Sequence, residues 1–138
     1  MDLNECKRRR FVKESSPDEE KSISLLDMAF EKEHLLSQLE ITNESVSTIF
    51  TLQYDALRMT LDSFCLLKGF VVLNHVCLGE LTNLLLPNFD LTLFNGSRFA
   101  RNSVNYYGKH VSLDRGKELI TQMKSLRLFV EKETRKII

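Results

Sequence analysis

The longest uninterrupted helical pattern in this chain runs from about residue 44 to residue 67. No Gly or Pro interrupts it, and its core-facing positions recur with a period of 3.6 residues, at Val46, Ile49, Phe50, Gln53, Tyr54, Leu57, Leu61 and Phe64. A helix with so long a stripe is stable only when other elements cover it. The pattern therefore predicts a central core helix around which the rest of the chain packs.

Two further helices are predicted before and after this one. The run Ser16-Pro17-Asp18-Glu19 combines a cap, a proline suited to the first helical position and an acidic residue three positions on. It predicts a helix that continues to about Leu39, with an apolar stripe that consists of Leu25, Leu26, Ala29, Phe30, Leu36 and Leu39. Asn74 then caps a short helix that Pro87 ends. His75 falls in its first turn, where we interpret it as a structural hydrogen-bonding group.

The C-terminal third predicts two more helices. Residues 90–107 form the first, which Asn95-Gly96 is expected to kink or delay. Ser112 caps the last helix. Its apolar stripe consists of Ile120, Met123, Leu126, Phe129 and Val130.

These patterns predict an all-α fold, an up-and-down four-helix bundle with an additional short helix. The segment Phe70-Val71-Val72-Leu73 has the composition of a strand, but no second strand is evident, so we interpret it as a buried connector. The predicted core includes Leu26, Phe50, Tyr54, Leu57, Leu61, Ile120 and Met123.

With 138 residues, the chain is long enough for one domain and too short for two. We assign residues 16–138 to the helical bundle and residues 1–15 to a polar, basic N-terminal leader. The basic run Lys7-Arg8-Arg9-Arg10 either contacts phosphates or is simply solvated. Phe11 and Val12 suggest that the end of the leader docks on the bundle.

The charges balance overall but are unevenly distributed. Because the net charge is zero, no global field attracts nucleic acid, and any anion site must be local. Residues 18–44 carry eight acidic and two basic side chains, whereas residues 109–138 carry eight basic and four acidic ones. These segments either lie against each other, face a partner, or present solvated helix faces.

The cysteines and the apolar segments favour a cytoplasmic protein without a metal site. Cys6, Cys65 and Cys77 form no metal-binding cluster, and we expect Cys65 and Cys77 to be small core residues in a reducing compartment. The most apolar part, residues 64–86, contains charged and polar residues that break any membrane span. No signal peptide is evident, and we expect no cofactor.

The strongest candidate for a functional site is the stretch 98–108. Its polar members are Arg98, Arg101, Asn102, Asn105 and Tyr106, and Gly108 is expected to end the helix. At helical spacing several of these side chains share one side, beside apolar neighbours. Guanidinium groups in such a setting need a carboxylate, a phosphate or a neighbouring subunit as a partner.

Arg101-Asn102, followed by a tyrosine pair and Gly108, resembles the signature helix of HEPN domains, which are small helical bundles. The resemblance extends over nearly the whole chain. Residues 11–18, 53–58 and 67–75 follow the order of elements in archaeal-type members.

The resemblance implies a specific chemistry and specific partners. HEPN nucleases cleave RNA without a metal, often as toxins paired with a nucleotidyltransferase antitoxin, and HEPN proteins commonly form homodimers through this helix. In such a nuclease Arg101, Asn102 and the residue at position 106 would be catalytic. The nucleases, however, carry a histidine where this chain has Tyr106. A tyrosine hydroxyl titrates near pH 10 and an imidazole near 6.5, so tyrosine is a poor proton carrier at neutral pH.

Three interpretations of the cluster are open. The first is a non-catalytic module in which Arg98, Arg101, Asn102, Asn105 and Tyr106 bind RNA, a nucleotide or a partner such as a nucleotidyltransferase. The second is a metal-independent ribonuclease, in which His110, nine residues past Arg101, could carry the proton only if it folded back. The third is a structural cluster in which Arg101 pairs with Asp55 or Asp62 and Asn102 satisfies backbone groups.

Overall fold

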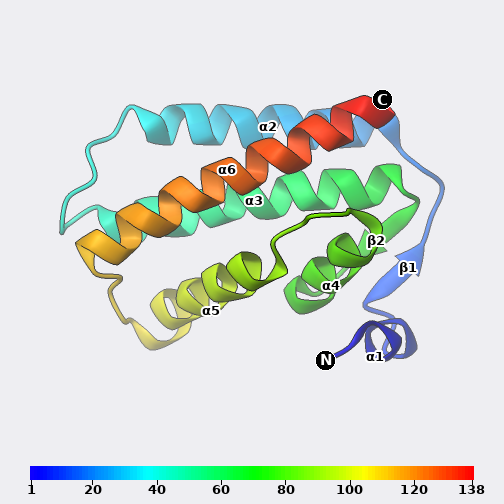
Figure 1. Ribbon diagram of the computed structural model, residues 1–138, viewed down its shortest axis with the longest axis horizontal. Coiled ribbons are helices and arrows are strands. Elements are labelled where there is room, and N and C mark those ends of the chain that lie inside the picture. Colours follow the sequence, from blue (N-terminus) through cyan, green and yellow to red (C-terminus); the bar gives the residue numbers. More distant parts are fainter.

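The computed structural model describes all 138 residues, and most of them are helical (Figure 1). The predicted predominance of helix is confirmed. The elements are α1 (Leu3–Arg8), β1 (Val12–Glu14), α2 (Glu19–Ser37), α3 (Val46–Leu67), β2 (Phe70–Val72), α4 (His75–Leu85), α5 (Leu91–Tyr107) and α6 (Leu113–Ile137). None of the helices combines the length and apolar character needed to cross a membrane.

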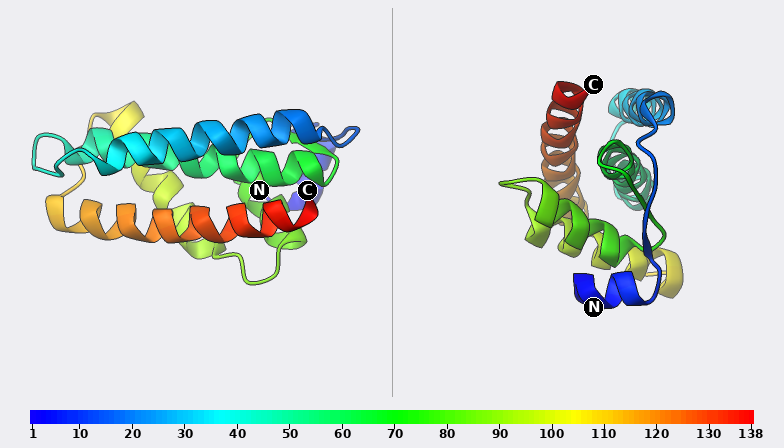
Figure 2. Two further views of the ribbon diagram at one scale, coloured as in Figure 1. Left: turned by 90° about the horizontal axis from the view of Figure 1, so that it is seen from above. Right: turned by 90° about the vertical axis from the view of Figure 1, so that its right-hand side faces the viewer.

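Helix α3 is the centre of the molecule, as its sequence predicts. It packs against α2 and α6 along its length and also against α4, α5 and β2. The seven residues predicted for the core are all buried. Seen along the long axis, α6, α3 and α2 stand beside one another, and α4 and α5 lie across one side of this layer (right-hand view of Figure 2).

The helix ends follow most of the capping signals. The side chain of Asn74 accepts hydrogen bonds from the first turn of α4, and Ser112 caps α6. Gly108 ends α5 in the left-handed conformation, with φ of 63°. Such a position strongly favours glycine because a Cβ atom would clash with the backbone.

Three local predictions were wrong. Helix α2 is capped by Asp18 rather than Ser16, since the Asp18 carboxylate accepts from the backbone N–H of Lys21 at 3.0 Å. Helix α5 begins at Leu91 and runs through Asn95-Gly96 as one element, so Asn95-Gly96 does not delay its start. Two residues assigned to the apolar stripe of α2, Phe30 and Leu39, are exposed, because α2 is an outer helix that packs mainly on α3.

The interpretation of residues 70–73 as a connector was also wrong, because β2 pairs with a second strand. That strand is β1, within the segment assigned to a leader, and Val12 lies opposite Val72 in an antiparallel pair. The leader is therefore part of the folded body: α1 is a short helix, and Phe11 and Val12 pack against the core as expected. Between α3 and β2, Gly69 makes the turn with φ of 89°.

A disulfide joins Cys6 of α1 to Cys77 of α4. This pairing departs from the expectation that Cys77 is only a small core residue. Cys65 is buried and free, as predicted, and burial raises the pKa of its thiol to about 12. Cys6 and Cys77 are 71 positions apart in sequence, and the disulfide between them fastens the N-terminal helix to α4.

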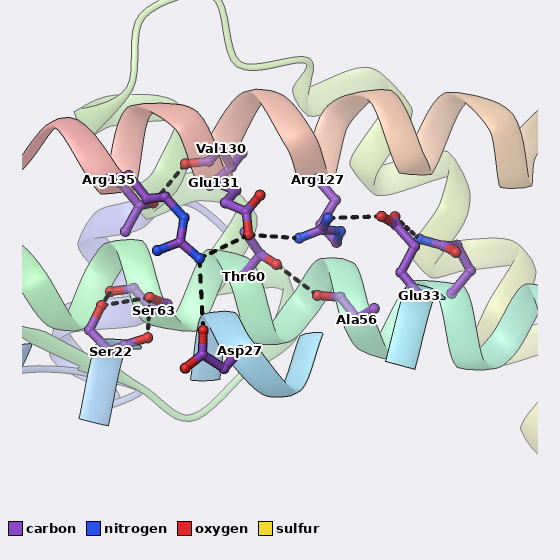
Figure 3. Close-up of polar contacts among 12 residues, drawn as sticks. Ser22, Asp27, Glu33, Ala56, Thr60, Ser63, Arg127, Val130, Glu131 and Arg135 are labelled. Carbon is purple, nitrogen blue, oxygen red and sulfur yellow. Dashed lines mark hydrogen bonds and ion pairs between the residues drawn. The ribbon is translucent and has the colours of Figure 1, made fainter. Parts of the chain in front are cut away.

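The acidic and basic segments meet at the boundary between α2 and α6 (Figure 3). The guanidinium of Arg127 donates to Glu33 of α2 at 2.8 Å and lies 3.5 Å from the carboxylate of Glu131. Arg135 lies 3.8 Å from Asp27 and 3.5 Å from Glu131. For these ion pairs, the acidic and basic segments lie against each other, which is one of the three arrangements expected from the uneven charge distribution.

Arg127 is almost fully buried, with only 2% of its surface exposed. Burial alone would lower the pKa of its guanidinium, but the hydrogen bonds and charges of Glu33 and Glu131 outweigh that effect and raise it. The cation is thus held in the protein interior by two carboxylates on different helices.

Candidate functional site

Most of the residues singled out in the sequence lie around one pocket, between α5 and the first turn of α4. Its volume is about 270 Å³. Two segments far apart in sequence line it: Leu73, Asn74, His75 and Val76 from the start of α4, and Arg98, Arg101, Asn102 and Tyr106 from α5.

Helix α5 brings its polar residues to the pocket through ordinary helical spacing. Positions 98, 101, 102 and 106 are separated by three and four residues and so follow one side of the helix. Asn105 does not line this pocket and is exposed. Of the five binding residues predicted from the sequence, the structure brings four together.

Neither Arg98 nor Arg101 forms an ion pair with a carboxylate. Their Nε atoms are buried and have no hydrogen-bond partner, and the only hydrogen bond of either guanidinium is a long one, 3.4 Å, from Arg101 to the amide oxygen of Asn102. Arg58 nearby differs, because it pairs with Asp62 at 2.8 Å. The pocket therefore holds two positive charges that the protein does not neutralise by direct contact.

Tyr54 of α3 contacts one pocket residue from each wall, Arg101 of α5 and His75 of α4. The guanidinium carbon of Arg101 lies 5.6 Å from the centre of its ring, within the range of a cation–π interaction. Its hydroxyl is 3.1 Å from Nδ1 of His75. Because α3 holds Tyr54 with no exposed surface, it fixes both α5 and α4 at this point. Burial raises the pKa of Tyr54, so the hydroxyl keeps its proton.

His75 is neutral at physiological pH. Burial, followed by the charges of Arg58 and Arg101, lowers the pKa of His75 to about 4; Asp55 opposes this effect and Arg98 adds to it. Its Nδ1 contacts Tyr54, whereas Nε2 has no partner within the protein and is not buried. A neutral imidazole in this position can donate or accept a hydrogen bond to a ligand in the pocket.

One aromatic side chain, Tyr106, lines the pocket. Tyr106 is 72% exposed, and Phe99 and Tyr107 of the same helix are exposed to a similar degree. Exposed aromatic rings beside guanidinium groups are suited to stacking on nucleobases or to contacts with another protein.

The contacts that a purely structural cluster was expected to make are absent. Arg101 forms no ion pair with Asp55 or Asp62, and Asn102 makes no hydrogen bond to the backbone. His110 is exposed in the turn after α5 and does not line the pocket. No group of three or more His, Cys, Asp or Glu side chains is placed to hold a metal ion.

Sequence reasoning did not assign His75 and Tyr54 to the site. His75 was interpreted as a structural group in the first turn of a helix, and Tyr54 as a core residue. Tyr54 is a fully buried core residue and lies within hydrogen-bond distance of His75, but His75 also lines the pocket and Tyr54 also contacts Arg101, a pocket residue. The sequence shows that His75 directly follows the capping residue Asn74, but only the tertiary structure shows that His75 lies opposite the arginines of α5.

The site combines unpaired guanidinium groups, a neutral imidazole and an exposed aromatic ring in a small pocket. This combination is chemically suited to an oxyanion attached to a planar group. Comparison of the chain with protein-family models, with curated proteins and with solved structures finds no match.

Proposed function

We propose that this protein is a HEPN-like, non-catalytic module that binds a phosphate group of RNA or of a nucleotide in the pocket between α4 and α5. Arg98 and Arg101 bind the phosphate, Asn102 orients it by hydrogen bonding, and Tyr106 stacks on a base. Asn105, also predicted for binding, lies outside the pocket and contributes at most at its edge.

One observation supports this proposal above the others. Two guanidinium groups line the same pocket with buried, unsatisfied Nε atoms, and no carboxylate pairs with either. Burying polar groups without partners costs free energy, so a ligand that completes the hydrogen bonds of these guanidinium groups would be bound favourably. Planar guanidinium groups match the geometry of phosphate oxygens.

Under this proposal α2, α3, α5 and α6 correspond to the four helices of the HEPN-like bundle, and α4 is the additional short helix. The direction of these four helices alternates along the chain, which is compatible with an up-and-down bundle (Figure 1).

We further propose that the protein forms a homodimer through α5 and is paired with a nucleotidyltransferase. The exposed aromatic residues of α5 support a protein contact there, since Phe99 and Tyr107 are each more than 70% exposed. Sedimentation should show a species of twice the 16.0 kDa monomer mass at micromolar concentration. Arg101→Glu should weaken that dimer. A wild-type protein that sediments only as a monomer would contradict the homodimer.

A second candidate function, metal-independent ribonuclease, is favoured by a specific observation. His75 lines the pocket that contains Arg101, and only its Nδ1 has a hydrogen-bond partner in the protein. With a pKa of about 4, a neutral His75 could accept a proton from a ribose hydroxyl, although it would be a weak base. Removing a positioned acid–base group typically lowers a rate by about 10² to 10⁴.

Binding and cleavage assays with the same RNA separate the two functions. We expect the wild type to bind RNA or a nucleotide without cleaving it, and Arg101→Ala to lose most of the affinity. Lys132→Ala is the matched control, because it removes an exposed positive charge of α6 outside the pocket. Cleavage that is lost in both Arg101→Ala and His75→Ala would establish the ribonuclease instead. Cleavage that appears only in Tyr106→His would show a nuclease site lacking one group.

A further inference from the structure

The basic run near the N-terminus lies beside the candidate site. We call Lys7, Arg8, Arg9 and Arg10 the α1 basic cluster; all four residues are exposed. Within the cluster, only Arg8 and Arg9 approach a carboxylate, that of Glu5, at 3.9 and 3.7 Å. One carboxylate therefore pairs with two of the four cationic side chains, and Lys7 and Arg10 form no ion pair.

Both ends of the cluster are fastened to the segment 73–77, whose first four residues line the pocket. Cys6, directly before the cluster, is joined by the disulfide to Cys77. Phe11, directly after it, accepts a hydrogen bond from the backbone N–H of Leu73 at 2.8 Å. Leu73 and His75 line the pocket, so the cluster begins within about 10 Å of the pocket wall, given the fixed spacing of backbone atoms.

Arg10 adopts a conformation that does not suit its residue type. Its φ is 62°, and it occupies the left-handed position of the cap that ends α1. The hydrogen bonds from Phe11 to Cys6 and from Arg10 to Lys7, at 2.9 and 3.1 Å, are those of the cap in which this residue is usually glycine. An arginine at this position destabilises the fold relative to glycine, and its side chain is exposed.

We propose that the α1 basic cluster extends the phosphate-binding pocket into a surface for single-stranded RNA, with one phosphate bound by Arg98 and Arg101 and the phosphates that follow it bound by the cluster. This inference rests on the proposed function. The exposed aromatic ring of Tyr106 beside the arginines favours a single strand, because unpaired bases can stack on such a ring. A ligand with one phosphate would occupy only the pocket.

The dependence of affinity on strand length and salt tests this surface. The probes are a labelled uridine oligomer of about 15 nucleotides and a uridine trinucleotide. The variant is Arg9→Ala/Arg10→Gly, and its control is Lys117→Ala/Lys132→Ala, which removes two exposed charges of α6. Loss of two phosphate contacts should reduce the slope of log K against log salt by about 1.4 and weaken binding of the long strand about 25-fold at 0.1 M salt.

The trinucleotide should bind the wild type and the Arg9→Ala/Arg10→Gly variant equally. The single variant Arg10→Gly should raise the unfolding midpoint while weakening the binding of the long strand, an opposition that misfolding cannot produce. If the α1 variant binds the long strand as tightly as the α6 control does, the extended surface is refuted while the pocket stands. If Arg101→Ala also leaves the affinity for both probes unchanged, or if the wild type binds neither, the proposed function fails as well.

Discussion

Replacing Arg127 by methionine should be one of the most damaging single changes outside the site. Methionine fills a similar volume, so the main effect is the loss of the cation that holds Glu33 and Glu131. Breaking a buried ion pair by removing one partner typically costs about 3–5 kcal/mol. Glu33 keeps 17% of its side chain exposed and Glu131 keeps Arg135, so we expect the lower end, about 3 kcal/mol. For a domain of this size that corresponds to a decrease of about 10 °C in Tm.

Urea unfolding followed by circular dichroism measures this free energy directly. Arg135→Met is the matched control, because Arg135 belongs to the same network but is 48% exposed, and exposed pairs are worth at most about 1 kcal/mol. Combining Arg127→Met with Glu33→Leu should recover part of the loss, since the second change removes the uncompensated carboxylate. Equal costs for Arg127→Met and Arg135→Met would refute the reasoning.

Three further predictions follow from other parts of the structure. Gly79→Ala should destabilise the protein by about 1–3 kcal/mol because the new Cβ would lie 2.7 Å from the buried ring of Phe94. Gly96→Ala should instead stabilise α5 by about 0.5–1 kcal/mol because its Cβ meets nothing within 4 Å. Thermal unfolding of each variant shows whether Tm decreases or increases. The pKa of His75 is about 4 in the folded protein and near 6.5 when unfolded, so the folded imidazole binds fewer protons, and the contribution of His75 to stability should fall as the pH decreases from about 6.5 to 4. Burial raises the pKa of Asp62 to about 6 and acts in the opposite direction, so the contribution of His75 is measured as the difference between the wild type and His75→Gln; identical pH series for the two proteins would contradict it. Thiol titration of the denatured, unreduced protein should find one free thiol, that of Cys65, and three titratable thiols would exclude the disulfide. Reduction of the disulfide should lower the unfolding free energy by about 4 kcal/mol, as expected for a loop of this length.

The helices were predictable because each carries its own signal. The stripe of α3, the caps at Asn74 and Ser112 and the stop at Gly108 depend only on neighbouring residues. The sheet was not predictable in the same way. Each strand has three residues, and its partner lies far away in sequence, so neither segment by itself distinguishes a strand from a connector. The disulfide is another long-range pairing, which an odd number of cysteines does not identify.

The site was predictable on one side only. The spacing of Arg98, Arg101 and Asn102 on one helix indicated their common direction, and the structure brings these residues together. The opposite wall depends on how α4 packs against α5, and His75 carries no local mark of that contact. The burial of Arg127 could not be predicted for a similar reason. Its position fits the buried side of α6, but an arginine is usually found at the surface.

The order in which the chain is synthesised gives the central position of α3 a further consequence. Its contacts with α2 form between helices that are adjacent in sequence, but its contacts with α6 wait for the last helix of the chain. A nascent chain that ends before Leu113 can therefore close the α2–α3 hairpin while one side of α3 is still uncovered. We expect a chain truncated at residue 112 to keep helical circular dichroism and to bind an apolar dye. Synthesis and packing of α6 would then cover the exposed apolar side of α3 and convert an aggregation-prone intermediate into the native protein.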